Sequence, residues 1–118
     1  MDYFSEKELA CKCDGCETKM DSEFMERLIE LREHCGFPFK LTSAYRCDKH
    51  NTDVGGYPGS YHVKGRAVDI QVYGENASKL LSLVRRYGFR GIGISAKGDF
   101  SKRFIHLDNR EHAAVWSY

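Results

Sequence analysis

The most informative segment of the chain reads Ser60-Tyr61-His62-Val63-Lys64-Gly65-Arg66-Ala67-Val68-Asp69-Ile70. Side chains alternate in character over residues 67–72, which predicts a β-strand whose valine and isoleucine side chains face the core. Asp69 then lies on the opposite face of that strand. Because Gly65 lets the chain turn before the strand begins, we expect the turn to place His62 beside Asp69.

A later segment supplies a second histidine. Residues 103–108 predict a strand in which Ile105 and Leu107 face the core, so that His106 and Asp108 share the other face. Two imidazoles and one carboxylate suit zinc, and three protein ligands leave a fourth position open, as in catalytic zinc sites. Bound zinc lowers the pKa of its water to about 7 and polarises a carbonyl. The spacing alone is equally compatible with unrelated polar residues.

The remaining patterns predict helices and strands around these two segments. In chain order they are a helix capped by Asp21 or Ser22 and ended by Gly36, a strand at 39–43, a polar loop at 46–61, a helix capped by Asn76 and ended by Gly88, and a hairpin of strands at 91–94 and 103–108. Strands that mostly lack crossover helices predict an α+β domain with a small antiparallel sheet and flanking helices.

Length and composition indicate one globular domain. The chain has 118 residues, of which 42% are hydrophobic and 30% are charged, an ordinary mixture for a single folded unit. We expect residues 1–20 to form a cysteine-containing N-terminal loop and residues 21–110 to form the catalytic core of this single domain, 1–118.

Charge and hydropathy argue against two classes of partner. The 18 basic and 17 acidic residues are spread along the chain, so we expect no nucleic-acid partner. No apolar run approaches the roughly 20 residues that span a bilayer, so no membrane insertion is expected. Residues 1–6 have neither the basic start nor the apolar stretch of a secretory signal, so we expect the protein to be cytoplasmic as synthesised. We also expect it to be a monomer.

Three of the five cysteines crowd together as Cys11, Cys13 and Cys16. Their C-x-C-x-x-C spacing could supply three thiolates to a second, structural zinc, with Cys35, Cys47 or a nearby histidine as the fourth ligand. The lack of a second C-x-x-C pair favours the alternative of unpaired thiols in a surface loop. A disulfide after export is a third alternative.

The segment 60–70 resembles the S-x-H-x-x-G-x-A-x-D motif of the zinc D-alanyl-D-alanine carboxypeptidase family, which includes phage endolysins and other cell-wall peptidases. Further blocks resemble this family in the same order: Thr42-Ser43-Ala44-Tyr45-Arg46, His50-Asn51, Gly55-Gly56, Gly91-Ile92-Gly93-Ile94 and Phe104-Ile105-His106-Leu107-Asp108-Asn109-Arg110. The resemblance covers residues 24–110, and several ordered blocks are more specific than any one. It implies an α+β fold that is also shared with hedgehog-type signalling domains.

The resemblance assigns roles to five residues. It implies that His62, Asp69 and His106 bind one catalytic zinc. Arg46 matches the family arginine that lies near the metal and contacts the substrate's carboxylate or the developing oxyanion, and its planar guanidinium suits either task. Ser60 matches the serine before the first ligand. We place Ser60 on the substrate-binding side, where its hydroxyl can orient the loop, and a simple turn role is equally compatible.

The chain departs from the family pattern at the general base. Some branches of the family place a carboxylate or histidine two or three residues before the last zinc ligand, where this chain has Phe104 and Arg103. We predict that Asp108 takes this catalytic role, because it shares a strand face with His106. Asp108 could instead orient a zinc-bound histidine or pair with Arg110. Further candidates for the base are Asp99 and His50.

These features predict a zinc-dependent peptidase that hydrolyses an amide bond in peptidoglycan peptides. The resemblance implies either a D-Ala-D-Ala carboxypeptidase or an endolysin-type endopeptidase that acts on cell wall after release by a phage pore. The alternative is a non-catalytic cell-wall-binding or virion structural module that retains the fold and the metal, because the acid before the last ligand is missing.

Overall fold

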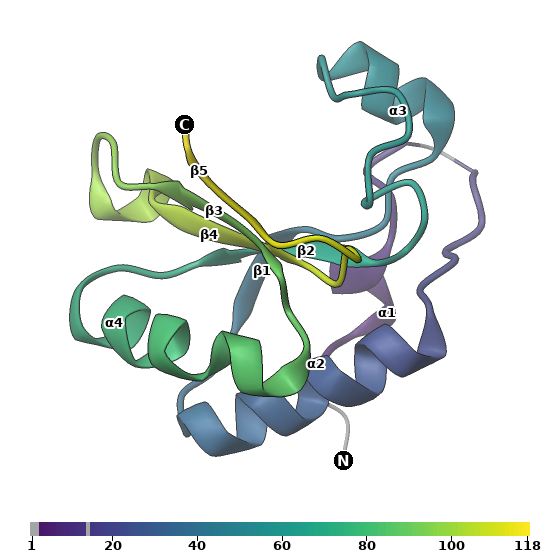
Figure 1. Cartoon of the computed structure of the whole chain (residues 1–118). Helices are drawn as coiled ribbons and strands as arrows, with labels where there is room; N and C mark the ends of the chain where they lie inside the picture. The colour runs from purple at the N-terminus through teal and green to yellow at the C-terminus, as the bar shows by residue number, and fades with distance from the viewer. Residues whose placement is uncertain (1–2, 14) are drawn as a thin grey trace.

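The sheet at the centre of the protein holds five strands in the order β1-β2-β4-β3-β5. The computed structural model describes residues 3–13 and 15–118 (Figure 1). The strands are β1 (Lys40–Ser43), β2 (Ala67–Gln71), β3 (Gly91–Ser95), β4 (Phe104–Asp108) and β5 (Ala114–Ser117). The helices are α1 (Glu6–Leu9), α2 (Ser22–Cys35), α3 (Asp48–Asp53) and α4 (Gly74–Leu83), with 3-10 turns at Val84–Tyr87 and Phe100–Lys102.

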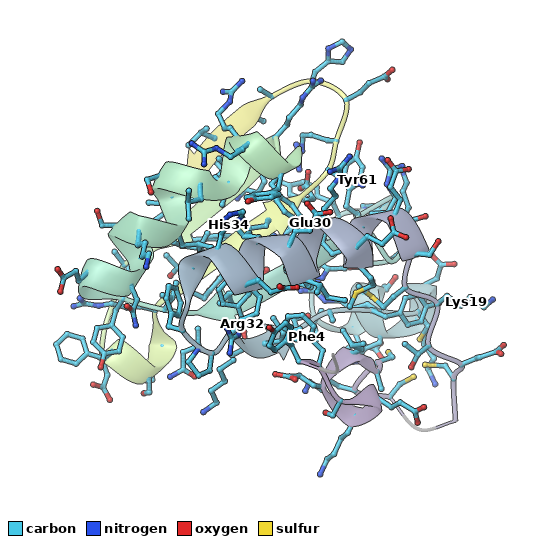
Figure 2. All side chains as sticks on the ribbon, turned by 90° about the horizontal axis from the view of Figure 1, so that it is seen from below. Phe4, Lys19, Glu30, Arg32, His34 and Tyr61 are labelled. Atoms are coloured by element: carbon cyan, nitrogen blue, oxygen red, sulfur yellow. The ribbon has the colours of Figure 1, made fainter. Side chains whose placement is uncertain are left out.

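Helices α2 and α4 lie on the same side of the sheet, as Figures 1 and 2 both show. The apolar residues of these helices pack against the inward side chains of the strands, which include Val68, Ile70, Ile105 and Leu107. Strand alternation therefore separates a core face, covered by helices, from a second face that carries polar side chains. The predicted α+β class with flanking helices is confirmed.

Helix α2 begins and ends where its sequence predicts. The Asp21 carboxylate accepts a hydrogen bond of 2.9 Å from the Phe24 N–H, which satisfies one of the free donors of the first turn. Gly36, at φ +75°, ends the helix in the left-handed region. The cap predicted for α4 is wrong, because that helix begins at Gly74 after Tyr73, two residues before Asn76.

Three short elements were not expected from the sequence. The polar loop predicted at 46–61 contains α3, and the N-terminal loop contains α1. Both helices are too short to show an apolar stripe, so hydrophobic periodicity could not reveal them. The third element, β5, pairs in parallel with β3 at the edge and makes the sheet mixed rather than purely antiparallel. In the part of the chain that the structure describes, every helix is too short or too polar to cross a membrane.

Two glycines of β3 make room for side chains of neighbouring strands. Gly91 pairs with Asp108, and a Cβ at Gly91 would lie 2.0 Å from the Asp108 Oδ1. Gly93 pairs with His106, and a Cβ at Gly93 would lie 2.5 Å from the indole nitrogen of Trp116. The Gly91-Ile92-Gly93-Ile94 block thus allows polar and aromatic side chains to lie flat across the non-core face.

We expect Gly91→Ala to lower the free energy of unfolding by about 1–3 kcal/mol, since the added methyl overpacks a buried carboxylate that cannot move aside. Urea denaturation followed by circular dichroism measures the change. Ser95→Ala is the matched control, because that position of β3 already carries a Cβ. An unchanged denaturation midpoint for Gly91→Ala would contradict the close packing at Asp108.

Candidate metal centre

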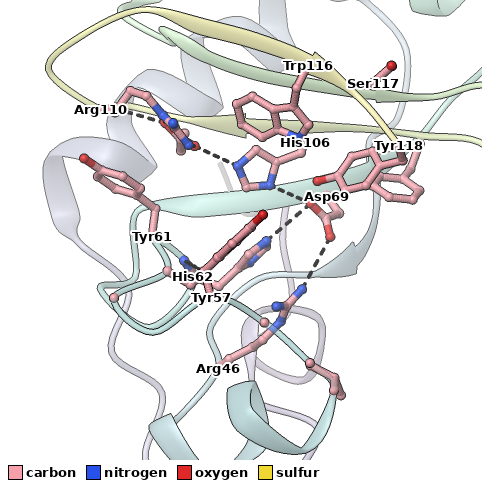
Figure 3. A pocket seen from close by; sticks show the side chains of 17 residues that line it. Arg46, Tyr57, Tyr61, His62, Asp69, His106, Arg110, Trp116, Ser117 and Tyr118 are labelled. Atoms are coloured by element: carbon pink, nitrogen blue, oxygen red, sulfur yellow. Dashed lines mark hydrogen bonds and ion pairs between the residues drawn. The ribbon is translucent and has the colours of Figure 1, made fainter.

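Three side chains from two segments of the chain meet on the non-core face of the sheet (Figure 3). Asp69 of β2 and His106 of β4 are direct cross-strand partners, and the His106 Nδ1 lies 2.9 Å from the Asp69 Oδ1. The His62 Nε2 lies 3.3 Å from the same oxygen. The three ligand atoms all lie within 4.8 Å of one another, and the residues are only 3–8% exposed. The predicted convergence of His62, Asp69 and His106 is therefore present.

The turn before β2 carries His62 into this position. The Ser60 hydroxyl accepts a hydrogen bond of 3.2 Å from the His62 N–H, which ties the turn together. Gly65, at φ +69°, closes the turn, and a Cβ there would lie 1.8 Å from the Lys19 carbonyl oxygen. Ser60 thus lies at the pocket beside the first predicted ligand and acts through the backbone of the turn.

In each histidine, the ring nitrogen that faces away from Asp69, here called the outer nitrogen, already has a hydrogen-bond partner. The His62 Nδ1 lies 2.7 Å from the Ala44 carbonyl oxygen, and the His106 Nε2 lies 2.7 Å from the Asp108 Oδ2. Both oxygens can only accept, so both outer nitrogens carry the proton. In the neutral rings, the inner nitrogens then present lone pairs toward the Asp69 carboxylate. Three acceptors in a buried space need a cation between them, and this donor set fits zinc.

Without a metal, a proton on His106 can take the place of the cation between these acceptors. Burial alone would lower the pKa of His106, but hydrogen bonds to Asp108 and Asp69 raise it above its ordinary value. Burial alone would raise the pKa of Asp69, but hydrogen bonds with His106 and His62 hold it well below its usual range. Asp69 therefore stays ionised and ready to bind a metal.

Asp108 is among the residues that line the pocket, but it lies behind His106, with which it bonds. Its side chain is fully buried, and both of its oxygens accept hydrogen bonds from Arg110, at 2.8 Å to Oδ1 and 2.7 Å to Oδ2. Burial raises the pKa of Asp108, but the bonds from Arg110 and His106 outweigh this and hold it well below its usual range. These contacts favour the orienting role that the sequence left open for Asp108.

Arg46 points at the metal centre from the segment after β1 (Figure 3). Its Nη2 lies 3.7 Å from the Asp69 Oδ2. Its Nε donates to the Ser43 hydroxyl and its Nη1 donates to the Asn51 Oδ1, both at 3.2 Å. Asn51 is itself buried and donates to the Tyr57 carbonyl oxygen at 2.8 Å. The guanidinium is therefore held in one orientation beside the three acceptors.

These residues line a pocket of about 770 Å³. Its aromatic walls come from three separate segments and comprise Tyr57, Tyr61, Phe104, Trp116 and Tyr118. Neither Asp99 nor His50, the further candidates for the base, lines this pocket. The sequence missed Trp116 and Tyr118, because residues 111–118 carried no predicted element. The alternation Ala114-Val115-Trp116-Ser117 was the signal that could have revealed this strand.

The structure also gathers four of the five cysteines. The three N-terminal thiols lie beside the thiol of Cys47, and all four sulfur atoms lie within 4.8 Å of one another. Cys35, the other candidate for a fourth ligand, lies in the core at 1% exposure. All five cysteines are unpaired, as the favoured prediction of unpaired thiols has it, and folding also brings Cys47 to the N-terminal segment as a candidate fourth ligand.

In metal-free protein we expect His106 to titrate above the ordinary histidine pKa of about 6.5, and Asp108→Asn to lower its pKa. Ring-proton NMR of chelator-treated protein measures both. Because the pKa is higher in the folded state, protonated His106 stabilises the metal-free fold at low pH, and this contribution is lost as pH rises through that pKa. Asp99→Asn is the control and should leave His106 unchanged. Titration of His106 below the ordinary value would contradict the assigned contacts.

Comparison with known proteins agrees with this geometry. The family model described as peptidase M15 matches residues 2–108. A comparison with curated proteins finds no match. The matched range contains Arg46, all three converging side chains and Asp108, whereas β5 with Trp116 and Tyr118 lies beyond it. The chain belongs to the peptidase M15 family, the family of zinc D-alanyl-D-alanine carboxypeptidases.

Proposed function

We propose that this protein is a zinc-dependent peptidase that hydrolyses an amide bond in peptidoglycan peptides. The observation that carries the proposal is the set of three inward-facing acceptors, His62 Nε2, Asp69 Oδ1 and His106 Nδ1, at the wall of an open pocket. Three protein ligands beside open space are the arrangement of catalytic zinc sites, whereas structural sites are closed by a fourth ligand. Membership of the M15 family supports the same chemistry.

The three ligands would hold zinc, which supplies a Lewis acid that polarises the scissile carbonyl and lowers the pKa of water. The protein's own contribution is orientation. Asp108 accepts the outer proton of His106, and the Ala44 carbonyl accepts that of His62, so both rings present the correct nitrogen to the metal. A hydrogen bond to the ring nitrogen that does not face the metal fixes the tautomer and the orientation of the ring. Asp108 is therefore a positioning residue in this proposal.

Arg46 would bind negative charge on the substrate. Its guanidinium has five N–H donors, of which one bonds to Ser43 and one to Asn51. The remaining donors can bind a carboxylate or the oxyanion that develops on the carbonyl during attack. Peptidoglycan stem peptides carry free carboxylates, which is why this substrate class suits the site. In a carboxypeptidase the terminal carboxylate would meet Arg46, and in an endopeptidase the oxyanion would.

A second candidate is a module that binds cell-wall peptides without cleaving them. Among the described residues that line the pocket, only Asp69 and Asp108 carry carboxylates, and both are fully engaged. The two positions where some relatives place an acid hold Phe104, which lines the pocket, and Arg103, whose Nε donates to the Gly98 carbonyl oxygen. The described residues of the pocket therefore offer no free carboxylate that could act as the general base, and this observation favours the binding module.

Incubation of zinc-loaded protein with purified peptidoglycan distinguishes the two candidates. We expect mass spectrometry to find new peptide termini that disappear with a chelator and with His106→Ala, because either treatment removes the metal. Released free alanine would identify a carboxypeptidase, and new internal termini would identify an endopeptidase. Tight binding without new termini would establish the module instead of the enzyme.

We expect Arg46→Ala to lower kcat/KM by about 10²–10³, the usual loss on removal of one donor to a developing charge. The matched control is Arg27→Ala, since Arg27 lies on the surface in an exposed pair with Glu30. Arg46→Lys should recover only part of the loss, because an ammonium lacks the planar fork. Equal activity of Arg46→Ala and wild type would rule out a role for Arg46 in binding substrate charge.

A further inference from the structure

Four cysteine sulfur atoms form a compact cluster away from the histidine centre. The Cys11 and Cys47 sulfur atoms lie 3.8 Å apart, those of Cys13 and Cys47 3.5 Å apart, and those of Cys13 and Cys16 2.7 Å apart. All four fall within 4.8 Å of one another. Four thiolates around one zinc, with bonds of about 2.3 Å, would lie about 3.8 Å apart, so the cluster has the size of such a site.

Backbone hydrogen bonds hold the N-terminal segment next to the segment that carries Cys47. The Tyr45 N–H donates to the Leu9 carbonyl oxygen at 3.2 Å, which joins the N-terminal segment to the chain just before Cys47. The Cys47 N–H donates to the Cys11 sulfur at 3.4 Å, and the His50 N–H donates to the Cys47 sulfur at 3.5 Å. Backbone donors aimed at sulfur favour the thiolate form, which is the form that binds a metal.

We propose that Cys11, Cys13, Cys16 and Cys47 bind one structural zinc. Four cysteine ligands saturate a tetrahedral zinc and leave no position for water or substrate. The site is therefore closed, in contrast to the open histidine centre. The C-x-C-x-x-C spacing brings three ligands from one short loop, and Cys47 closes the site from another part of the chain, as structural zinc sites of small domains do.

This zinc would fix the segment that carries Arg46. Cys47 follows Arg46 directly and caps α3, since its sulfur accepts the His50 N–H. Within α3, Asn51 bonds to the Arg46 guanidinium. Through Cys47, the metal would join the N-terminal loop to the N-cap of α3, so that α3 and Arg46 keep their places beside the pocket. The N-terminal cysteines would thus help to hold Arg46 in position beside the pocket.

The rival chemistry is oxidation, because the Cys13 and Cys16 sulfur atoms are the closest pair in the cluster. A disulfide between them would remove two ligands and leave no thiolate site for zinc. Zinc and a disulfide therefore exclude each other and give opposite results in a metal count and in the mass of the intact chain, which falls by two hydrogens on oxidation.

Elemental analysis of the full chain, purified with a reductant and with zinc in the medium, tests the proposal. We expect two zinc ions per chain in wild type and in Cys35→Ala, the matched control for loss of a buried cysteine outside the cluster. His106→Ala and the double variant Cys13→Ser/Cys16→Ser should each retain one. Absence of zinc from His106→Ala, or an intact mass that shows a Cys13–Cys16 disulfide, would overturn the proposal.

A second readout covers the case in which the double variant does not fold. Cobalt added to metal-free His106→Ala should give the intense thiolate-to-metal absorption of a four-sulfur site, and no such absorption would overturn the proposal. A mercurial that displaces the metal from thiolates should speed amide hydrogen exchange at residues 47–51 at least about tenfold, but not in β4. Unchanged exchange at 47–51 would refute the link to Arg46. None of these readouts uses peptidase activity, so they stand apart from the test of the proposed function.

Discussion

The structure depends on one electrostatic constraint: three groups that can only accept a hydrogen bond or bind a cation face one another in a buried space. The inner nitrogens of His62 and His106 meet an oxygen of Asp69, and all three residues are almost fully buried. Such an arrangement is costly unless a metal or protons lie between the acceptors. Asp108 and the Ala44 carbonyl enforce it by holding the outer nitrogen of each ring. Their contacts leave the inner nitrogens of the neutral rings as acceptors that face Asp69.

The sheet satisfies this constraint through its register. Asp69, His106 and Gly93 lie side by side on three adjacent strands, so the pairing that builds the core also brings two of the three converging side chains together. Strand alternation sends Val68 and Ile70 toward the helices while Asp69 faces the pocket. A shift of register by one residue would exchange the two faces. Hydrophobic burial and the convergence of the three candidate ligands therefore require the same pairing.

The loops around the sheet complete the site with different physical devices. A hydrogen bond from the His62 N–H to the Ser60 hydroxyl holds the turn that places His62 beside Asp69. Asn51 holds Arg46, and the thiol of Cys47 caps the short helix that carries Asn51. Positions near the metal centre are thus set by local polar contacts, whereas the sheet beneath is set by apolar packing. This division explains why the site can be rigid although much of its wall consists of loop.

The sequence by itself determined the features that depend on local periodicity and short motifs: helix α2 with its Asp21 cap, strands β1 to β4, and the placement of Asp69 and His106 on polar strand faces. Alternation and capping are local, so they can be read without coordinates. Only the tertiary structure decided that β5 adds to β3 in parallel and brings Trp116 to the pocket, and that Cys47 joins the N-terminal thiols. It also decided that Asp108 faces His106 and Arg110 rather than open space. These outcomes follow from contacts between residues far apart in the chain, which no local pattern encodes.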